Sequence, residues 1–400
     1  MHAPHAKGAP SRNDVPADTL RGKDMLCFGH DFTGDPLSKT HLMRILARDN
    51  RILWINSIGY RAPTASKSDL SRAINKLRSA TEPVREVERN IFVLNPLAIP
   101  VYGMDWVKIV NRQLLRFQVL RAMRRLGFVK PINWVFTPSA GVVAGALGED
   151  MVVYYCVDEF TAFTDLPPQM VQLEDELCRR ADLVIVSAQR LYDSKILKNP
   201  RTVLVRHGVD FAHFQKALAP ATEVPAEIAH LPRPILGYFG LMAADWIDID
   251  LLVKVAKHFS SGSLVLLGKV TTDLSRLTAL PNVHLLGRKP FATLPGYSKG
   301  FDVALNPFPI SEVTLNANPL KVREYLAAGL PVVSTRIPEV EVLGQCRIAD
   351  NPEAFIREIE AALAAPGPQA ARSESMRQES WEGRVEEVRR HVASFKANPS

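Results

Sequence analysis

Residues 316–335 read NANPLKVREYLAAGLPVVST, and this stretch is the most informative in the chain. Asn318 is a residue type that caps helices, and Pro319 suits the first turn of a helix. Gly329 stands where a left-handed C-cap is expected, and Pro331 prevents the helix from continuing. The apolar residues after the second proline predict a short strand. The stretch therefore predicts a complete helix-to-strand unit.

Two charged residues share one face of this predicted helix. Lys321 and Glu324 are three positions apart, which places their side chains together near the helix N-terminus. A helix N-terminus has free N–H groups and partial positive charge, so it suits a phosphate group. A carboxylate one turn further along can accept hydrogen bonds from sugar hydroxyls.

These residues resemble the nucleotide-sugar helix of GT-B glycosyltransferases, especially the large group 1 family (family 4-like). In that family a helix glutamate, followed by a small residue, glycine and Pro-Val-Val, binds the donor ribose, and Glu324 occupies this position. The family usually has a second glutamate eight residues earlier, near the donor sugar, where this chain has Asn316. The resemblance implies a donor-binding site that contains Glu324, Lys321, Asn316 and Pro319.

Further donor-side candidates follow predicted strands in the second half of the chain. Gly240 ends one such strand and lets a ligand approach the backbone, although an ordinary strand-to-helix turn is the alternative. Residues 286–288, Leu-Gly-Arg, resemble a family turn that contacts the nucleotide base. Many group 1 enzymes hold the diphosphate with an Arg and a Lys that this chain lacks. We therefore expect Lys321, Arg288 and Lys269 to neutralise the phosphates.

The acceptor side is predicted from a buried strand over Val152–Cys156 that is followed by two acids, Asp158 and Glu159. A carboxylate at the carboxyl end of such a strand can act as general base toward an acceptor hydroxyl. Similar Tyr-x-x-x-Asp strand ends occur in exopolysaccharide glycosyltransferases, with the aspartate as base. Asp158 is the first candidate and Glu159 the second, and the alternative is a solvated loop acid that caps the next segment.

Two histidine loops complete the candidates. His30 and Asp31 follow the first predicted strand and face the same cleft, so we expect them to bind the acceptor, or alternatively the donor diphosphate. A structural or solvated histidine is the other interpretation. The segment His-Gly-Val-Asp from His207 is similar to a group 1 turn that reads Asn-Gly-Val-Asp, and we expect this histidine to be structural.

Short apolar runs alternate with helical stretches from residue 24 to residue 335. Strands are expected at Met25–Gly29, Ile52–Asn56, Ile91–Leu94, Asn133–Phe136, Val152–Cys156, Leu183–Val186 and Thr202–Val205, and in a second series at Ile235–Phe239, Ser263–Leu267, Val283–Leu285, Val303–Leu305 and Val332–Ser334. Such alternation implies parallel sheets with right-handed crossovers. The predicted fold class is α/β with GT-B architecture, in which two Rossmann-like doubly wound domains face each other across a cleft.

The domain boundaries follow from changes in composition. We expect a disordered tail over residues 1–23, an acceptor-binding domain over 24–216, a linker over 217–233, a nucleotide-sugar-binding domain over 234–378, and a C-terminal helix over 379–400 that crosses back to the first domain. The linker is placed at a segment rich in proline and alanine, where helical and strand periodicity stops.

The overall composition is that of an ordinary globular protein, with 46% hydrophobic and 23% charged residues among 400. The four cysteines are far apart and form no C-x-x-C pair, which indicates a reducing compartment and argues against a structural zinc. Residues 1–23 lack the apolar core of a signal peptide. The longest uncharged run, residues 131–148, is interrupted by Pro and Gly, which favours a buried strand and helix over a membrane span.

The net charge of +7 is uneven along the chain. Residues 105–130 contain seven basic residues, one acid and interleaved apolar residues, which is typical of a basic amphipathic helix. Such a helix can dock on an anionic membrane, or its apolar stripe can pack on the core beneath a solvated basic face. No aromatic-basic motif or nucleic-acid module supports binding to nucleic acid. We expect a cytoplasmic protein that lies peripherally on the inner face of the plasma membrane.

No metal or cofactor is expected. The triplet Asp248-Ile249-Asp250 has the D-x-D spacing of a metal-nucleotide motif, but it starts a predicted helix, where aspartate caps the backbone. No G-x-S-x-G elbow or Walker loop is present, so nothing supports nucleophilic hydrolase chemistry.

The resemblance implies a glycosyltransferase that moves a sugar from a nucleotide-sugar donor to a lipid-linked saccharide in cell-surface or exopolysaccharide biosynthesis. Two alternatives remain open at this point. One is a nucleotide-sugar 2-epimerase of the same fold, which needs no acceptor. The other is a non-catalytic protein that binds nucleotide sugars or serves as a scaffold.

Overall fold

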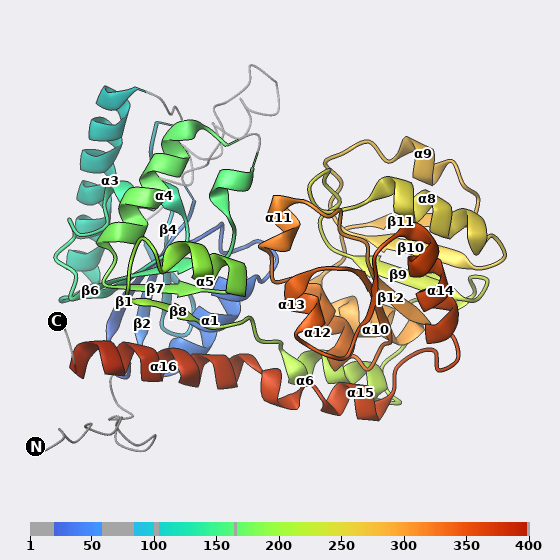
Figure 1. Ribbon diagram of the computed structural model, residues 1–400. Helices are drawn as coiled ribbons and strands as arrows, with labels where there is room; N and C mark the ends of the chain where they lie inside the picture. The colour runs from blue at the N-terminus through green and yellow to red at the C-terminus, as the bar shows by residue number, and fades with distance from the viewer. Residues whose placement is uncertain (1–19, 58–83, 100–103, 164–165, 398–400) are drawn as a thin grey trace, which may run out of the picture.

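The computed structural model describes residues 20–57, 84–99, 104–163 and 166–397. They form two α/β domains that lie side by side and are built on separate sheets (Figure 1). Most of the predicted tail, residues 1–23, lies outside the described residues. Its last four residues are ordered, because Leu20 is buried in the first domain and its carbonyl accepts a hydrogen bond from Arg389 at 2.7 Å.

The first domain contains an eight-stranded sheet in the order β3-β4-β2-β1-β5-β6-β7-β8. Its strands are β1 (Asp24–Phe28), β2 (Arg51–Ile55), β3 (Arg85–Glu88), β4 (Ile91–Leu94), β5 (Ile132–Val135), β6 (Met151–Cys156), β7 (Leu183–Val186) and β8 (Thr202–Leu204). All pairs are parallel except β3 with β4. The edge strand β3 escaped the sequence prediction because its residues, Arg-Glu-Val-Glu, carry no apolar run.

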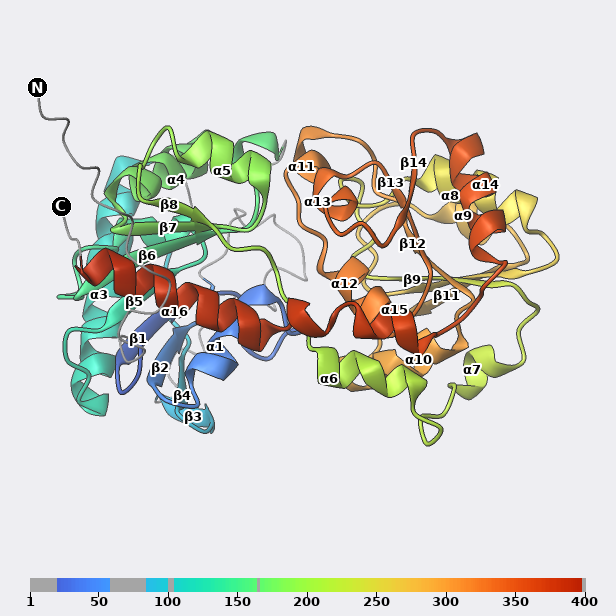
Figure 2. The same cartoon turned by 60° about the horizontal axis from the view of Figure 1, so that its bottom comes forward.

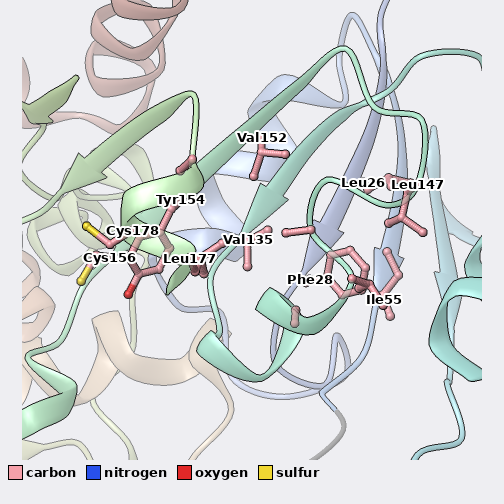
Figure 3. Packing of buried hydrophobic residues seen from close by; sticks show 14 of the residues in the cluster. Leu26, Phe28, Ile55, Val135, Leu147, Val152, Tyr154, Cys156, Leu177 and Cys178 are labelled. Carbon is pink, nitrogen blue, oxygen red and sulfur yellow. The ribbon is translucent and has the colours of Figure 1, made fainter. Parts of the chain in front are cut away.

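Successive residues of a strand point to opposite sides of the sheet, and in this domain both sets are apolar. Helices therefore cover both faces. They are α1 (Ser38–Leu46), α3 (Asp105–Leu126), α4 (Pro168–Arg180) and α5 (Gln189–Lys195), with 3₁₀ turns η1 (Pro138–Val142) and η2 (Phe160–Ala162). Leu26 and Phe28 of β1 enter the core beneath α3 and α4, where Figure 3 shows Phe28 close to Ile55. Met25 and Cys27 enter the opposite core, beneath α1.

The second domain contains a six-stranded parallel sheet in the order β11-β10-β9-β12-β13-β14. Its strands are β9 (Ile235–Phe239), β10 (Ser263–Leu267), β11 (Val283–Gly287), β12 (Val303–Asn306), β13 (Val332–Thr335) and β14 (Arg347–Ala349). Its helices include α8 (Ile249–His258), α9 (Ser275–Thr278), α10 (Leu294–Gly300), α11 (Glu312–Leu315), α12 (Leu320–Ala327), α13 (Pro338–Glu341), α14 (Pro352–Ala362) and α15 (Ala370–Glu374). The predicted α/β class with two parallel-sheet domains is confirmed.

The last helix, α16 (Trp381–Ala397), lies against the first domain and not the second (Figure 2). Val385, Val388 and Val392 on one of its faces enter the core beside α1. The chain therefore crosses between the domains twice, once after β8 and once before α16. The structure places the returning helix where the sequence analysis expected it, although residues 398–400 are outside the described part.

The predicted linker over residues 217–233 is wrong. This segment contains α7 (Ala226–Ala229), and Ala217 and Ile228 are buried in the core of the second domain. Its proline-rich composition reflects short packed turns, because Lys299 donates hydrogen bonds to the carbonyls of Ala219 and Thr222 at 2.8 and 2.7 Å. The connection between the domains lies earlier, at residues 205–210.

Residues 316–335 fold as a helix and a strand, α12 and β13, and differ from the prediction only at the start of the helix. The N-cap is Pro319, and Asn318 makes no cap, because its amide donates to the Ser187 carbonyl of the first domain at 2.6 Å. Gly329 follows the helix with φ +84°, as predicted. A Cβ there would also lie 2.6 Å from the Gln369 carbonyl oxygen, so only glycine fits.

Candidate functional site

A cavity of about 490 Å³ lies between the two domains. Its first-domain wall consists of the loop after β1, the start of α1 and the residues after β6. Its second-domain wall consists of the ends of β9 and β10, the residues after β11 and the first half of α12. These are the carboxyl ends of parallel strands in both sheets, which is where ligands of doubly wound domains bind.

The second-domain wall carries Glu324 and Lys321, and both line the cavity. Burial raises the pKa of the Glu324 carboxyl to about 8, and burial lowers the pKa of the Lys321 ammonium to about 7. Lys321 Nζ lies 3.1 Å from Tyr238 Oη and 4.4 Å from the centre of the Phe308 ring. Among the described residues the Glu324 carboxyl has no hydrogen-bond or ion-pair partner. Both groups therefore have bonding capacity left for a ligand.

Gly240 sets the position of Lys321. Its φ is +144°, and a Cβ on it would lie 2.9 Å from Lys321 Cε. The glycine that we predicted to admit a ligand thus also lets the lysine side chain lie against the end of β9. Pro319, the N-cap of α12, lines the cavity next to this pair.

The first-domain wall carries Asp158, as predicted, and Lys39, which we did not predict. Burial raises the pKa of the Asp158 carboxyl, and the nearby Lys39 ammonium opposes this rise. Burial lowers the pKa of Lys39, and Asp158 opposes that fall. Neither side chain forms a hydrogen bond or a salt bridge with another described residue. Lys39 Nζ lies over a ring face, 5.9 Å from the centre of Phe136.

Arg288 and Lys269, which we expected to neutralise the donor phosphates, line the cavity on the second-domain side. Arg288 donates two hydrogen bonds to Asp35 of the first domain, at 2.9 Å from Nε and 2.7 Å from Nη2. More than half of each side chain is exposed, so this ion pair is weakly held and open to exchange with a ligand. Lys269 is exposed and has no such partner within the described part of the chain.

The structure does not bring Glu159 to the cavity. Its carboxylate pairs with Lys195 at 3.1 Å and accepts the backbone N–H of Thr161 at 3.3 Å, which caps η2. Lys195 also pairs with the buried Glu174 at 3.1 Å. This buried ion-pair group explains why Glu159, although adjacent to Asp158, points away from the cavity. Its hydrogen bond to Thr161 is the capping role that we considered as the alternative for these acids.

Asn316, His30 and Asp31 are also absent from the cavity wall. The Asn316 amide donates to the Glu312 carbonyl at 2.7 Å, within the end of α11. His30 Nε2 lies 3.3 Å from the Asp35 carbonyl, and burial lowers the pKa of this histidine to about 4. The ring supports the loop after β1, and Asp31 is exposed on that loop. The loop does reach the cavity, but through later residues.

The sequence analysis missed Lys39 because no motif surrounds it. The available signal was positional, since a lysine at the start of the helix after the first strand lies at the cleft of such a fold. Asn318 was read as a cap, yet it lines the cavity and joins the domains. His207 also lines the cavity, with Nδ1 at 2.9 Å from the Asn318 carbonyl, and burial lowers its pKa to about 3.

The D-x-D triplet serves the structural role that we predicted. The Asp248 carboxylate accepts the N–H of Leu251 at 2.9 Å and caps α8, and Asp250 pairs with Arg276 at 2.7 Å. Within the described ranges, no group of three or more His, Cys, Asp or Glu side chains could hold a metal ion. The helices in the same ranges include none that is long and apolar enough to span a membrane.

Comparisons with known proteins agree with this architecture. Residues 233–365 match the family described as Glycosyl transferases group 1. A teichuronic acid biosynthesis glycosyltransferase of Bacillus subtilis (strain 168), TuaH, is 24% identical over 257 residues. That alignment covers 58% of this chain, and it spans 64% of the length of the relative.

Solved structures show the same fold. Sucrose-phosphate synthase from Thermosynechococcus elongatus has a TM-score of 0.69 at 15% identity, over 94% of this chain and 99% of that chain. An E. coli structure described as trehalose-6-phosphate bound with UDP-2-fluoro glucose has a TM-score of 0.62 at 13% identity, over 94% and 98% of the two chains. The GT-B architecture, expected from the alternation of strands and helices, and the resemblance to group 1 glycosyltransferases, expected from residues 316–335, are therefore confirmed.

Proposed function

We propose that this protein is a glycosyltransferase that moves a sugar from a nucleotide-sugar donor to an acceptor hydroxyl in the interdomain cavity. One observation carries the proposal. Two carboxyls, Glu324 and Asp158, and two ammonium groups, Lys321 and Lys39, line one cavity from opposite domains, and none of the four forms a salt bridge with another described residue. Buried charges are normally paired, so this arrangement is expected where a polar ligand completes the pairing.

The second-domain wall is suited to the donor. The Glu324 carboxylate can accept two hydrogen bonds from the ribose hydroxyls, and Lys321 with the N-terminus of α12 can bind the diphosphate. Arg288 can leave Asp35 for a phosphate, because a phosphate offers the same bidentate geometry. The family match covers this domain, and the E. coli neighbour was solved with a UDP-sugar analogue. Both observations support a nucleotide sugar as donor.

The first-domain wall is suited to the acceptor. Asp158 is the group that removes the proton from the acceptor hydroxyl, if the reaction inverts the anomeric carbon. The acceptor oxygen then bonds to that carbon while the bond to the leaving phosphate oxygen breaks. The nucleoside diphosphate departs with its negative charge against Lys321. If the reaction retains the configuration, Asp158 positions the acceptor instead.

The acceptor and the place of action are inferred from α3, which forms the outer edge of the first domain (Figure 1). Its apolar residues do not form the single stripe that we predicted, because they occupy two faces. Val107, Leu115, Val119 and Met123 are buried against the sheet. Trp106, Ile109 and Phe117 are 58%, 62% and 58% exposed among basic residues. Exposed aromatic and basic side chains on one helix suit an anionic membrane surface.

We therefore propose a lipid-linked saccharide as acceptor and peripheral binding to the cytoplasmic face of a membrane. The TuaH relative, which is named for teichuronic acid biosynthesis, supports a role in cell-surface polysaccharide assembly. Binding to vesicles that contain anionic lipid should fall roughly 100-fold when Arg121, Arg124 and Arg125 are changed to Gln, at about 1 kcal/mol per charge. Vesicle binding that is unchanged in this triple variant would refute the assignment of α3.

The donor site is tested by binding of UDP, GDP, dTDP, ADP and their common sugars, measured by thermal shift and calorimetry. We expect one nucleotide family to raise the melting temperature. Glu324→Ala should weaken binding of that nucleotide sugar by roughly 10- to 100-fold, the loss of a charged hydrogen bond. Glu353→Gln, an exposed substitution in the same domain, is the matched control and should bind like the parent protein.

The outcomes separate the alternatives. Undiminished affinity in Glu324→Ala contradicts the donor site. Nucleotide binding without sugar transfer, across a panel of donors and acceptors, favours a binding or scaffold protein. Epimerisation of a free nucleotide sugar in the absence of any acceptor identifies a 2-epimerase.

A further inference from the structure

Trp246 lines the interdomain cavity but has no part in the assignments made above. It stands in the turn that joins β9 to α8, and it is only partly buried. Two backbone hydrogen bonds hold this turn. The N–H of Trp246 donates to the carbonyl of Ala243 at 2.9 Å. The N–H of Asp248 donates to the carbonyl of Pro307 at 2.8 Å. The indole ring is therefore carried by a fixed segment at the carboxyl end of β9.

On the donor side, the Trp246 ring lies next to Phe308. The two ring centres are 5.4 Å apart. The Phe308 ring in turn has Lys321 Nζ over its face, 4.4 Å from its centre. Both Phe308 and Lys321 line the cavity. A single aromatic ring therefore separates the indole from the ammonium group that we assign to the diphosphate of the donor.

On the acceptor side, the Trp246 ring lies next to Phe163 of the first domain, with 6.4 Å between the ring centres. Phe163 is the C-cap of η2, and the N-cap of this turn, Glu159, directly follows Asp158. Trp246 therefore adjoins the segment that carries the proposed base, as well as the residue that supports the proposed phosphate ligand.

These two neighbours place the ring where the transferred sugar is expected. The anomeric carbon must lie between the leaving phosphate oxygen, against Lys321, and the acceptor hydroxyl, against Asp158. The Trp246 ring adjoins the supports of these same two groups and lines the cavity between them. A sugar ring that contains this carbon therefore comes against the indole.

The indole also has binding capacity left for a sugar. Neither aromatic neighbour is stacked parallel to it, because the angles between the ring planes are 61° with Phe308 and 50° with Phe163. Trp246 Nε1 donates no hydrogen bond to another described residue, and it is not one of the buried atoms that lack a partner, so it is accessible. A pyranose has C–H groups on its ring faces and hydroxyls around its rim. An aromatic ring with one N–H donor can bind both kinds of group.

We propose that Trp246 is a specificity-determining residue that packs against the pyranose ring of the donor and donates a hydrogen bond from Nε1 to one of its hydroxyls. This inference rests on the proposed glycosyltransferase function, and it adds the recognition of the transferred sugar. Glu324 and Lys321 are assigned to the ribose and the diphosphate, which are the nucleotide part of the donor. Trp246 should therefore affect the affinity for a nucleotide sugar and not the affinity for the nucleotide alone.

The test compares the dissociation constants of a nucleotide and of its sugar conjugates, measured by calorimetry on the same variant. The sets are UDP with UDP-glucose and UDP-N-acetylglucosamine, GDP with GDP-mannose, dTDP with dTDP-glucose, and ADP with ADP-glucose. In Trp246→Ala, the Kd of the nucleotide sugar should rise roughly tenfold while the Kd of its nucleotide stays within about twofold. Trp246→Phe keeps an aromatic ring beside Phe308 and Phe163, so the rise should be smaller, about threefold. Leu197→Ala changes an exposed apolar residue outside the cavity and should leave both constants as in the parent protein.

The outcomes separate this inference from the donor site on which it rests. A loss confined to the nucleotide sugar supports the role of Trp246. An equal rise of both constants in Trp246→Ala overturns it, because the ring then supports the cavity wall as a whole. Unchanged constants in that variant also overturn it, as does a parent protein that binds a nucleotide but none of its sugar conjugates. If the parent protein binds none of these compounds, the donor site itself is refuted and the role of Trp246 with it.

Discussion

The two walls of the interdomain cavity carry the same pair of groups, a carboxyl and an ammonium, but they are built in opposite ways. On the second-domain wall, Lys321 and Glu324 belong to one helix, three residues apart. On the first-domain wall, Lys39 comes from the start of α1 and Asp158 from the loop after β6. One pair is a property of a local sequence, and the other exists only because two distant segments meet.

This difference predicts different behaviour on mutation. The second-domain pair should govern affinity for the nucleotide, which is a ground-state property. The first-domain pair should govern the rate of transfer, because its groups act on the hydroxyl that reacts.

The largest effect is expected from Asp158→Asn. An amide of the same shape cannot take the acceptor proton, so kcat should fall roughly 10²- to 10⁴-fold. Nucleotide affinity should stay within about twofold of the parent protein, because the side chain lies on the other wall. Steady-state transfer assays and calorimetry with the donor nucleotide measure the two quantities. An equal loss in Glu159→Gln would break the assignment, since Glu159 is paired with Lys195 away from the cavity.

A smaller effect is expected from pH acting through Lys321. Burial lowers its pKa to about 7, so the ammonium gains its charge as the pH falls through 7. A diphosphate prefers the charged form, so the contribution of Lys321 to its affinity should rise about tenfold in total on going from pH 8 to pH 6, most of it between pH 8 and pH 7. Calorimetry in buffers of different ionisation enthalpy should also detect proton uptake on binding.

The Glu324 carboxyl works in the opposite direction, because its raised pKa of about 8 makes it ionise as the pH increases. The pH dependence of nucleotide affinity that Lys321 causes is therefore best measured in Glu324→Gln, with and without Lys321→Met. We expect the pH dependence of nucleotide affinity to be clear in the single variant and flattened in the double variant. A slope that persists without Lys321 would move the phosphate contact to another cation.

The smallest effect is expected from Lys39→Met, which removes a cation but no hydrogen bond. Lys39 opposes the rise that burial causes in the pKa of Asp158, so its loss should raise that pKa further. The acid limb of the transfer rate against pH should then shift to higher pH, with a milder loss of rate near pH 8. Lys39→Arg, which keeps the charge, should restore the limb. An unshifted limb in Lys39→Met would show that the lysine does not act through Asp158.

The second-domain wall could be predicted because the signals that build it are local. The helix begins at a proline and ends at a glycine with positive φ, so both of its ends are set within one stretch of sequence. Lys321 and Glu324 are three residues apart and therefore share one face of this helix, and both line the cavity. Even there, the role of Asn318 was misread, because its partner Ser187 is in the other domain. Asn316 lies near the same helix but is held by the carbonyl of Glu312.

The first-domain wall could be predicted only in part. Asp158 and Glu159 are adjacent in sequence and chemically alike. They differ in the structure because Glu159 pairs with Lys195, which also pairs with Glu174, whereas Asp158 lines the cavity. His30 likewise has a partner outside the cavity, because its Nε2 lies 3.3 Å from the carbonyl oxygen of Asp35. No local pattern records such partners.

The fold class, most of the strands and the helix that bears Glu324 could be predicted from the sequence, because caps, turns and hydrophobic period are read within a few residues. Only the tertiary structure could show that residues 217–233 pack on the second domain and that Lys39 lies near Asp158. The physical reason is that contacts between distant segments depend on packing and on competing charges, and these arise only after both domains have formed.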